Sequence, residues 1–305
     1  MTNRRDVLRG IGGGIAVISI GGVGVASANP GNGQGDGRTA EVRVGHLSPD
    51  TPAVDVYVGD PGLDPTADGT DPVVSGLEYP TFAPDDAGGY LPLDAGTYDI
   101  SVTPAGVPSL EAIDIDGFEL EANRDYTVLA IGELAPEAAT FGDGDEPALR
   151  ALPLADNGDG DPAFPPADAT LVRAVHASPD AGAVDVVVTV DGDEVARLED
   201  VLFGTASPYL ELPADAEIAV EKAGDTVLGP IDNPLENGQT GSAYVIGNVT
   251  PESGGDGPLG AETDDGGLSA VTTLDAENPS RDRGPGDGGP GRGSGRDRGR
   301  GRGGD

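Results

Sequence analysis

The sequence predicts an all-β protein built from two tandem immunoglobulin-like β-sandwich domains, flanked by a disordered N-terminal segment and a disordered Gly/Arg-rich C-terminal tail. Short runs of alternating apolar and polar residues recur about every 8–12 residues, with turn residues between them. The pattern occurs twice: residues 42–58 and 172–188 carry Val-Arg, His, Ser-Pro-Asp and Ala-Val-Asp-Val at matching places. No stretch after the N-terminal segment shows helical periodicity.

The composition is strongly acidic, with 17 Lys and Arg against 54 Asp and Glu and a formal net charge of −37. Lys222 is the single lysine. At molar salt the Debye length is about 3 Å, so repulsion between acidic side chains is screened. The composition is similar to that of proteins from extreme halophiles, and we interpret the charge as an adaptation to salt. The chain has no Cys, which excludes disulfides and thiolate metal sites.

Residues 1–28 are predicted to be a twin-arginine export signal. Arg4 and Arg5 precede an apolar, glycine-rich run from Ile11 to Ala26, and Ala26-Ser27-Ala28 fits a cleavage site. The run is shorter than the roughly 20 apolar residues of a membrane span. We therefore expect a cleaved signal and no stable membrane span afterwards, with an uncleaved anchor as the alternative.

A Gly/Asn-rich linker over residues 29–39 leads into the first module, residues 40–155. The period-two pattern predicts strands there, separated by turn residues at Ser48-Pro49-Asp50 and by a Pro/Gly/Asp-rich loop over residues 59–80. These predicted strands cover residues 42–47, 54–58, 90–93, 98–102, 113–115, 126–131 and 149–154.

Residues 156–168 are predicted to be an Asp/Gly/Pro linker to the second module, residues 169–275. Asp191-Gly192 predicts a tight hairpin. Further strands are predicted at residues 172–176, 184–188, 195, 201–202, 209–212, 218–220, 244–246 and 268–274. No apolar core could form from residues 276–305, which are predicted to be disordered.

Three stretches, HxSPDxxAVDVxV, FGTxSxYLxLPA and YLxLxAGTYDxxVTPAG, resemble the bacterial and archaeal domain-of-unknown-function family numbered forty-three ninety-seven. The resemblance covers both modules. It is nearest at His46–Asp50 and Tyr90–Gly106 in the first copy, and at His176–Val188 and Phe203–Pro213 in the second. It implies an exported, sandwich-like surface module without known catalysis, and it supplies no functional residues.

The two histidines, His46 and His176, occupy the same repeat position. Each could form a metal-binding or acid–base pair with a carboxylate of its own repeat. The interpretation that we favour is structural: each ring ends a strand and hydrogen-bonds the turn that follows. The repeat-motif positions concerned are His46, Ser48, Pro49, Asp50 and Asp55, and His176, Ser178, Pro179, Asp180 and Asp185.

A structural role is favoured because a metal site needs three or more ligands and each module offers one imidazole. Ser48 and Ser178 lie two residues after a histidine, but neither stands in the G-x-S-x-G elbow of a hydrolase. We therefore predict no catalytic residue, no metal and no cofactor.

Acidic loops are further candidates, for Ca²⁺. None of them matches the D-x-[DN]-x-[DN]-G spacing of a calcium loop, so we expect solvated loops, with a weak divalent site as the alternative. Their residues are Asp60, Asp64, Asp68 and Asp71; Asp143, Asp145 and Glu146; and Asp156, Asp159 and Asp161.

Two segments indicate other surface chemistry. Asn248-Val249-Thr250 is an N-glycosylation acceptor. The Arg/Gly tail is similar in composition to RNA-binding segments, but an exported protein rarely meets RNA and salt weakens phosphate binding. We expect a solvated tether or a segment that contacts acidic envelope glycoproteins, and no nucleic acid partner.

We therefore expect an exported, non-enzymatic cell-surface or extracellular protein of a halophile with a binding or structural role. Envelope glycoproteins or polysaccharide are the expected partners. Two alternatives stay open: a hydrolase or metal-dependent enzyme that uses the His/Asp pairs, and a cation-binding surface protein. The sequence does not indicate whether the modules pack together, which oligomer forms or which ligand is bound.

Overall fold

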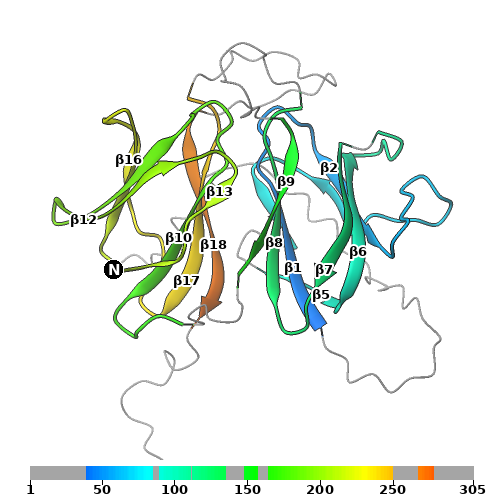
Figure 1. Cartoon of the computed structure of the whole chain (residues 1–305), viewed down its shortest axis with the longest axis horizontal. Helices are drawn as coiled ribbons and strands as arrows, with labels where there is room; N and C mark the ends of the chain where they lie inside the picture. The colour runs from blue at the N-terminus through cyan, green and yellow to red at the C-terminus, as the bar shows by residue number, and fades with distance from the viewer. Residues whose placement is uncertain are drawn as a thin grey trace, which may run out of the picture. The chain divides into compact units, whose positions relative to one another are not determined.

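The computed structural model describes residues 39–84, 89–110, 112–134, 148–156, 164–249 and 267–277. These residues form strands and turns without a helix, which confirms the predicted all-β class (Figure 1). The predicted signal, the Arg/Gly tail and most of the predicted linker between the modules lie outside the described residues.

Within the described ranges, no helix has the length and apolar character needed to cross a membrane.

The first module consists of two sheets, which we call its facing sheet and its outer sheet. The facing sheet has the order β4 (Thr81–Ala83), β1 (Thr39–His46), β8 (Asp125–Ile131), β9 (Arg150–Ala155), with β5 (Leu91–Asp94) also beside β1. The outer sheet has the order β3 (Val74–Leu77), β2 (Val54–Gly59), β6 (Gly96–Pro104), β7 (Ile113–Leu120). β1 and β8 run parallel, and the other neighbouring strands are antiparallel.

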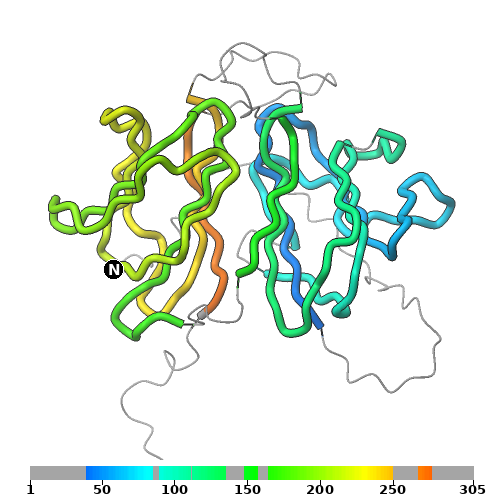
Figure 2. Tube along the Cα trace, viewed as in Figure 1, coloured from blue at the N-terminus to red at the C-terminus, as the bar shows by residue number. Residues whose placement is uncertain are grey.

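The second module repeats this arrangement strand for strand. Its facing sheet has the order β13 (Thr205–Ala206), β10 (Thr170–His176), β17 (Gln239–Ile246), β18 (Ser269–Glu277), with β14 (Leu210–Leu212) beside β10. Its outer sheet has the order β12 (Asp193–Val201), β11 (Val184–Val190), β15 (Glu217–Lys222), β16 (Asp225–Asp232). β10 and β17 are again parallel. Figure 2 shows the same course of the chain twice, from blue to green and from green to orange.

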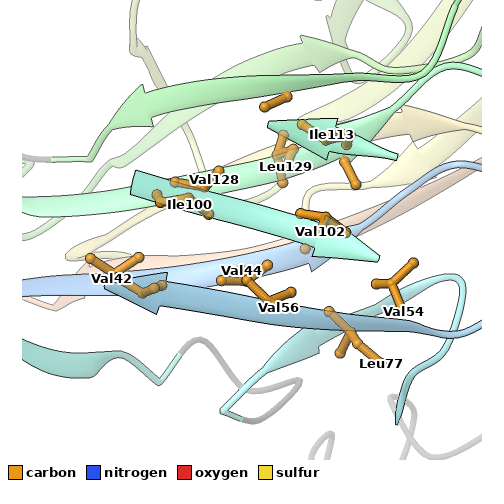
Figure 3. A pocket seen from close by; sticks show the side chains of 14 residues that line it. Val42, Val44, Val54, Val56, Leu77, Ile100, Val102, Ile113, Val128 and Leu129 are labelled. Carbon is orange, nitrogen blue, oxygen red and sulfur yellow. The ribbon is translucent and has the colours of Figure 1, made fainter. Parts of the chain in front are cut away.

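Each module has an apolar core between its two sheets. In the first, Val42 of β1 and Val128 of β8 pack against Val56 and Val102 of the outer sheet. A cavity of about 20 Å³ in this core is lined almost wholly by apolar atoms (Figure 3). It has room for about one water molecule but offers no polar partners, so it is expected to stay dry. The cavity is therefore a packing void and not a ligand site.

The central strands of both facing sheets are buried on both faces. Val42 and Val44 point into the core of the first module, whereas Leu47, Leu129 and Ile131 belong to a second apolar cluster that includes side chains of the other module. The members of this second cluster are Leu47, Phe82, Leu129, Ile131 and Leu154 of the first module, and Val175, Ala177, Tyr244 and Ile246 of the second. The modules therefore pack against each other through their facing sheets.

Most of the predicted strands and the hairpin occur, but residues 195 and 201, predicted to lie in separate strands, belong to the single strand β12, and β16 was not predicted. The loop predicted over residues 59–80 is also wrong in part. It contains β3, which pairs with β2. Short strands such as β3 and β4, four and three residues long, give too few residues for a period-two pattern. The hairpin at Asp191-Gly192 is confirmed, with φ of 54° and 85°, as a type I′ turn requires.

The close packing of the facing sheets predicts that Gly45→Ala destabilises the protein. A Cβ at Gly45 would lie 2.6 Å from Phe82 Cε1 and 2.7 Å from Leu129 Cδ2, so these two interface side chains would have to move. We expect a loss of about 1–3 kcal/mol in the free energy of unfolding, measured by denaturant titration. Gly267→Ala is the matched control, because no atom lies within 4 Å of its added Cβ. Equal stability of the two variants would contradict the packing described.

Candidate functional site

The ring of His46 is buried and holds the loop that follows β1. Its Nε2 lies 3.2 Å from the carbonyl oxygen of Thr51 and 3.1 Å from that of Pro52, so Nε2 carries the proton. The backbone N–H of Ser48 donates to Nδ1 at 3.4 Å. Burial disfavours the charged ring and lowers the pKa of His46 to about 4. The histidine is therefore neutral at neutral pH, with both nitrogens engaged by backbone groups.

His176 has the same arrangement in the second module. Its Nε2 lies 2.6 Å from the carbonyl oxygen of Gly182, and the backbone N–H of Ser178 donates to Nδ1 at 3.3 Å. Burial also lowers the pKa of His176. An imidazole held in this way is poorly placed to exchange protons with a substrate.

The aspartates of the two Ser-Pro-Asp turns fasten neighbouring loops. Asp50 Oδ1 accepts the backbone N–H of Leu134 at 2.8 Å, and Asp180 Oδ1 accepts that of Val249 at 2.7 Å. Leu134 follows β8 and Val249 follows β17, so each turn is fixed to the end of the parallel neighbour strand. The prolines of the turns, Pro49 and Pro179, are buried.

The second pair of motif aspartates, Asp55 and Asp185, accepts hydrogen bonds at the outer sheets. Asp55 accepts backbone N–H groups of Gly76 and Gly106, both at 2.8 Å. Asp185 accepts the backbone N–H of Asp200 at 2.9 Å and contacts Arg197 at 3.4 Å. Within the described part of the chain, no three residues of the types His, Cys, Asp or Glu gather closely enough to hold a metal ion.

The two motif serines have different surroundings. The Ser48 hydroxyl lies 2.6 Å from the Thr51 hydroxyl. In the second repeat Ala181 stands where Thr51 stands in the first, and the buried Ser178 hydroxyl has no hydrogen-bond partner among the described residues. The Ser48 hydroxyl also donates to Asp50 Oδ1 at 3.3 Å.

The acidic-loop candidates are only partly within the described residues. Asp64 accepts hydrogen bonds from the backbone and hydroxyl of Thr66, at 2.9 and 2.6 Å, and is exposed together with Asp60, Asp68 and Asp71. Asp143, Asp145, Glu146, Asp159 and Asp161 lie outside the described residues.

The expectation of a solvated loop is wrong for Asp156, which belongs to a cluster of four buried charges between the facing sheets. Arg43, Arg173 and Asp275 complete the cluster, and all four side chains are at most 5% exposed. The shortest ion pairs cross between modules: Arg43 Nη2 lies 2.5 Å from Asp275 Oδ1, and Arg173 Nη2 lies 2.5 Å from Asp156 Oδ1. Within a module the Arg–Asp distances are longer, 3.5 Å and 3.8 Å.

A second nitrogen of each of these two guanidinium groups also donates a hydrogen bond across the interface. Nη1 of Arg43 donates to the carbonyl oxygen of Leu274 at 3.0 Å, and Nη1 of Arg173 donates to that of Ala155 at 2.9 Å. Burial disfavours the charge of Arg43, but nearby Tyr244 and Asp275 outweigh it and raise the pKa of the guanidinium. Both arginines therefore keep their charge inside the interface.

Hydroxyl groups complete the coordination of both carboxylates. The donors come in equivalent sets: Tyr90 (2.9 Å) and Thr127 (2.5 Å) to Asp156, and Tyr209 (2.8 Å) and Ser242 (2.5 Å) to Asp275. Burial and, to a smaller extent, the Asp275 carboxylate raise the pKa of Asp156, whereas Arg173 and Arg43 lower it; the pKa is raised overall. All contacts of Asp156 are nevertheless donors, which favours the ionised form.

Among the described residues, three further contacts between polar or aromatic side chains of the two modules lie outside the charged cluster. The rings of Phe82 and Tyr244 lie 5.2 Å apart. The guanidinium of Arg150 lies 4.7 Å from the ring centroid of Phe203 and donates to the carbonyl oxygen of that residue at 3.2 Å.

The third contact involves the predicted glycosylation acceptor. Asn248 is only 7% exposed, and its Nδ2 donates to Glu133 Oε1 at 3.3 Å. A glycan on this nitrogen would have to displace Glu133, so the folded structure disfavours modification of Asn248.

Sequence reasoning missed the charged cluster, although the sequence contained a signal. Arg43 and Arg173 occupy the same repeat position within strands that are otherwise apolar, where a solvated arginine would be unusual. The partner carboxylates gave no such signal, because Asp156 opens an acidic loop and Asp275 lies near the acidic end of the second module.

Comparison with known proteins places the chain in a family. The model of a family described as "Domain of unknown function (DUF4397)" matches residues 40–187 and 170–265. The chain belongs to this family. The two overlapping DUF4397 matches cover the first module, the segment between the modules and the second module up to residue 265. No curated protein matches the chain.

Two solved structures show weak likeness. The Bacillus anthracis TIE protein is 12% identical, with a TM-score of 0.20, over 68% of this chain and 34% of that chain. The fimbrial anchor protein Mfa2 from Porphyromonas gingivalis is 11% identical, with a TM-score of 0.18, over 79% of this chain and 100% of that chain. The chain thus spans about a third of the TIE protein. At these TM-scores neither likeness bears on fold or function.

The cluster predicts that Arg43→Met is strongly destabilising. Loss of the guanidinium leaves the buried Asp275 without its shortest ion pair, and breaking one partner of a buried pair costs about 3–5 kcal/mol. Arg197→Met is the matched control: Arg197 contacts Glu194 and Glu221 on the outer sheet and is 27% exposed, so solvent screens its ion pairs and a much smaller loss is expected. Denaturant unfolding of both variants measures the difference, and similar losses would contradict the importance of the cluster.

The buried histidines predict a pH-dependent component of stability. The pKa of His46 is about 4 in the folded protein, below its ordinary value of 6.5, so between these pH values the unfolded chain binds a proton that the folded chain does not. Stability from the neutral ring is present above pH 6.5 and is lost as the pH falls toward 4, by up to about 3 kcal/mol.

His46→Gln keeps an amide donor and acceptor but does not titrate. The difference in unfolding free energy between wild type and this variant should therefore shrink as the pH is lowered from 7.5 to 4.5. Denaturant titrations at several pH values measure it. A difference that stays constant over this range would show that the ring is not held neutral.

Proposed function

We propose that the chain is an exported, non-enzymatic protein of the cell surface or extracellular space of a halophile, where it binds or spaces surface components. The observation that carries this proposal is the buried Arg–Asp cluster, which joins two copies of one module through their facing sheets. Two modules joined in this way hold their outer sheets at a fixed separation. The repeat-motif histidines and aspartates support the proposal, because their contacts hold loops in place.

At a finer level, each module is proposed to be an immunoglobulin-like sandwich. Support comes from two sheets of short, mainly antiparallel strands around one apolar core in roughly 100 residues. Such sandwiches commonly carry recognition on their outer strands and end loops. The predicted twin-arginine signal over residues 1–28 supports export of the chain.

Envelope glycoproteins or polysaccharide are the proposed partners. The outer sheet of the second module carries exposed side chains of Glu194 and Val195 beside the half-buried Arg197. A surface that mixes charged and apolar groups can contact glycans through hydrogen bonds and through their apolar faces. The acidic composition keeps this surface hydrated at molar salt.

Binding of the purified chain to isolated host envelopes in molar salt tests the proposed role. We compare residues 29–305 with a chain that ends at residue 280, because the Arg/Gly tail is the alternative attachment segment. Saturable binding that persists without the tail is expected and would place recognition in the modules. Absence of saturable binding by both forms would contradict an envelope-binding role.

The export part of the proposal is tested in the native host by replacing Arg4 and Arg5 with Lys in the full chain. Retention of this variant inside the cell, with the unchanged chain outside, is the expected result. The same location for both chains would contradict twin-arginine export.

A further inference from the structure

The two modules meet across a pseudo-two-fold axis. Arg43 of the first module pairs with Asp275 of the second, and the equivalent Arg173 pairs with Asp156, which directly follows β9 and whose backbone N–H bonds to Asp125 of the first module. Such reciprocal pairs are the mark of an isologous interface, in which the same patch on both partners is self-complementary. On charge pairing alone, a first module could therefore bind another first module as well as it binds a second module.

One contact near the axis breaks this equivalence. His46 pairs with Ala130 between β1 and β8, and His176 pairs with Val245 between β10 and β17. Glu133 and Asn248 each stand three residues after these partners, so they occupy the same position in the two modules. They also contact each other, with Nδ2 of Asn248 3.3 Å from Oε1 of Glu133. A residue that contacts its own equivalent lies at the axis of an isologous interface.

We propose that the facing sheet of the first module selects a second module over another first module, and that Glu133 is a residue that determines the selection. Two first modules would place two Glu133 carboxylates against each other where the chain now has a carboxylate and an amide. Glu133 is half-buried, and like charges placed directly opposite each other at an interface oppose association. The partner that fits the facing sheet of the first module is therefore a second module, from the same chain or from a second copy.

A separate contact points to the same selection. Arg150 pairs with Ile131 in β9, and Ser269 pairs with Ile246 in β18, so Ser269 is the counterpart of Arg150. Arg150 crosses the interface and packs over Gly204 so closely that a Cβ at this position would overlap its Nη2.

Pro80 is the counterpart of Gly204 in the first module. Thr205 pairs with His176 and Thr81 pairs with His46, so the residues that precede these threonines correspond. Two first modules would therefore bring Arg150 against a proline ring in place of Gly204. This steric conflict adds to the repulsion between the carboxylates.

The test uses the full chain with a specific protease site introduced between residues 157 and 163, cut after folding. Two versions carry different N-terminal tags, which mark the first module. Both versions are cut and mixed, and the first-module fragment that carries one of the tags is captured. For the wild type, we expect the second-module fragment to be captured with it. We expect the first-module fragment that carries the other tag to be absent from the captured material.

Three variants separate charge repulsion from general damage to the interface. Asn248→Glu places two carboxylates together and should weaken retention of the second-module fragment by about tenfold or more. The double variant Glu133→Asn with Asn248→Glu exchanges the two residues and should restore retention. Glu133→Asn alone should raise capture of the oppositely tagged first module, because the repulsion between first modules is gone.

Two results would overturn the proposal. One is capture of the oppositely tagged first module by the wild type at the level of the second module. The other is equal retention by Asn248→Glu and the exchanged double variant. Circular dichroism of each cut chain establishes that the modules are folded, so that loss of retention reports on the interface. Neither of these two results depends on whether the protein is exported or binds envelopes.

Discussion

The buried cluster of two arginines and two aspartates is the constraint on which the arrangement of this protein depends. Four charges between two sheets are stable there only because each guanidinium and carboxylate meets an opposite charge and further hydrogen-bond partners. The shortest ion pairs join residues of different modules, so the desolvated charges are paired only when the modules are together. In a chain with a net charge of −37, this cluster also places two of the few arginines where bulk salt screens them least.

The Ser-Pro-Asp repeat has a local role that supports this interface. Each motif closes a loop onto its own histidine and fastens the segment after β8 or β17, from which Glu133 or Asn248 reaches the other module. The motif thus helps to set the position of these two interface residues. The similarity of the two motifs in the sequence explains why the two ends of the interface match. The ends differ where Glu133 stands opposite Asn248, and where Arg150 and Pro80 of the first module correspond to Ser269 and Gly204 of the second.

Much of the fold could be predicted from the sequence, because alternating Val, Ile and Leu with Gly, Pro and Asp between them specify strands and turns locally. The duplicated motif gave the two modules and their equivalence. The packing of one module against the other could not be predicted, because β1 and β10 bury both faces and an alternating pattern does not show what covers the second face. Asp156 was predicted as a solvated loop residue because its sequence neighbours are Asp, Asn and Gly, whereas its partners come from β8, β10 and the segment before β5.

Burial of β1, β8, β10 and β17 on both faces has a consequence for how the protein unfolds. In a chain of independent sandwiches, each module opens separately and two transitions are observed. Here the central strands of each module form one wall of its own core and also one side of the shared interface. Unfolding of either module therefore exposes both its own core and the interface. We therefore expect the two repeats to unfold in one cooperative transition, so that the duplication contributes to stability as well as to surface area.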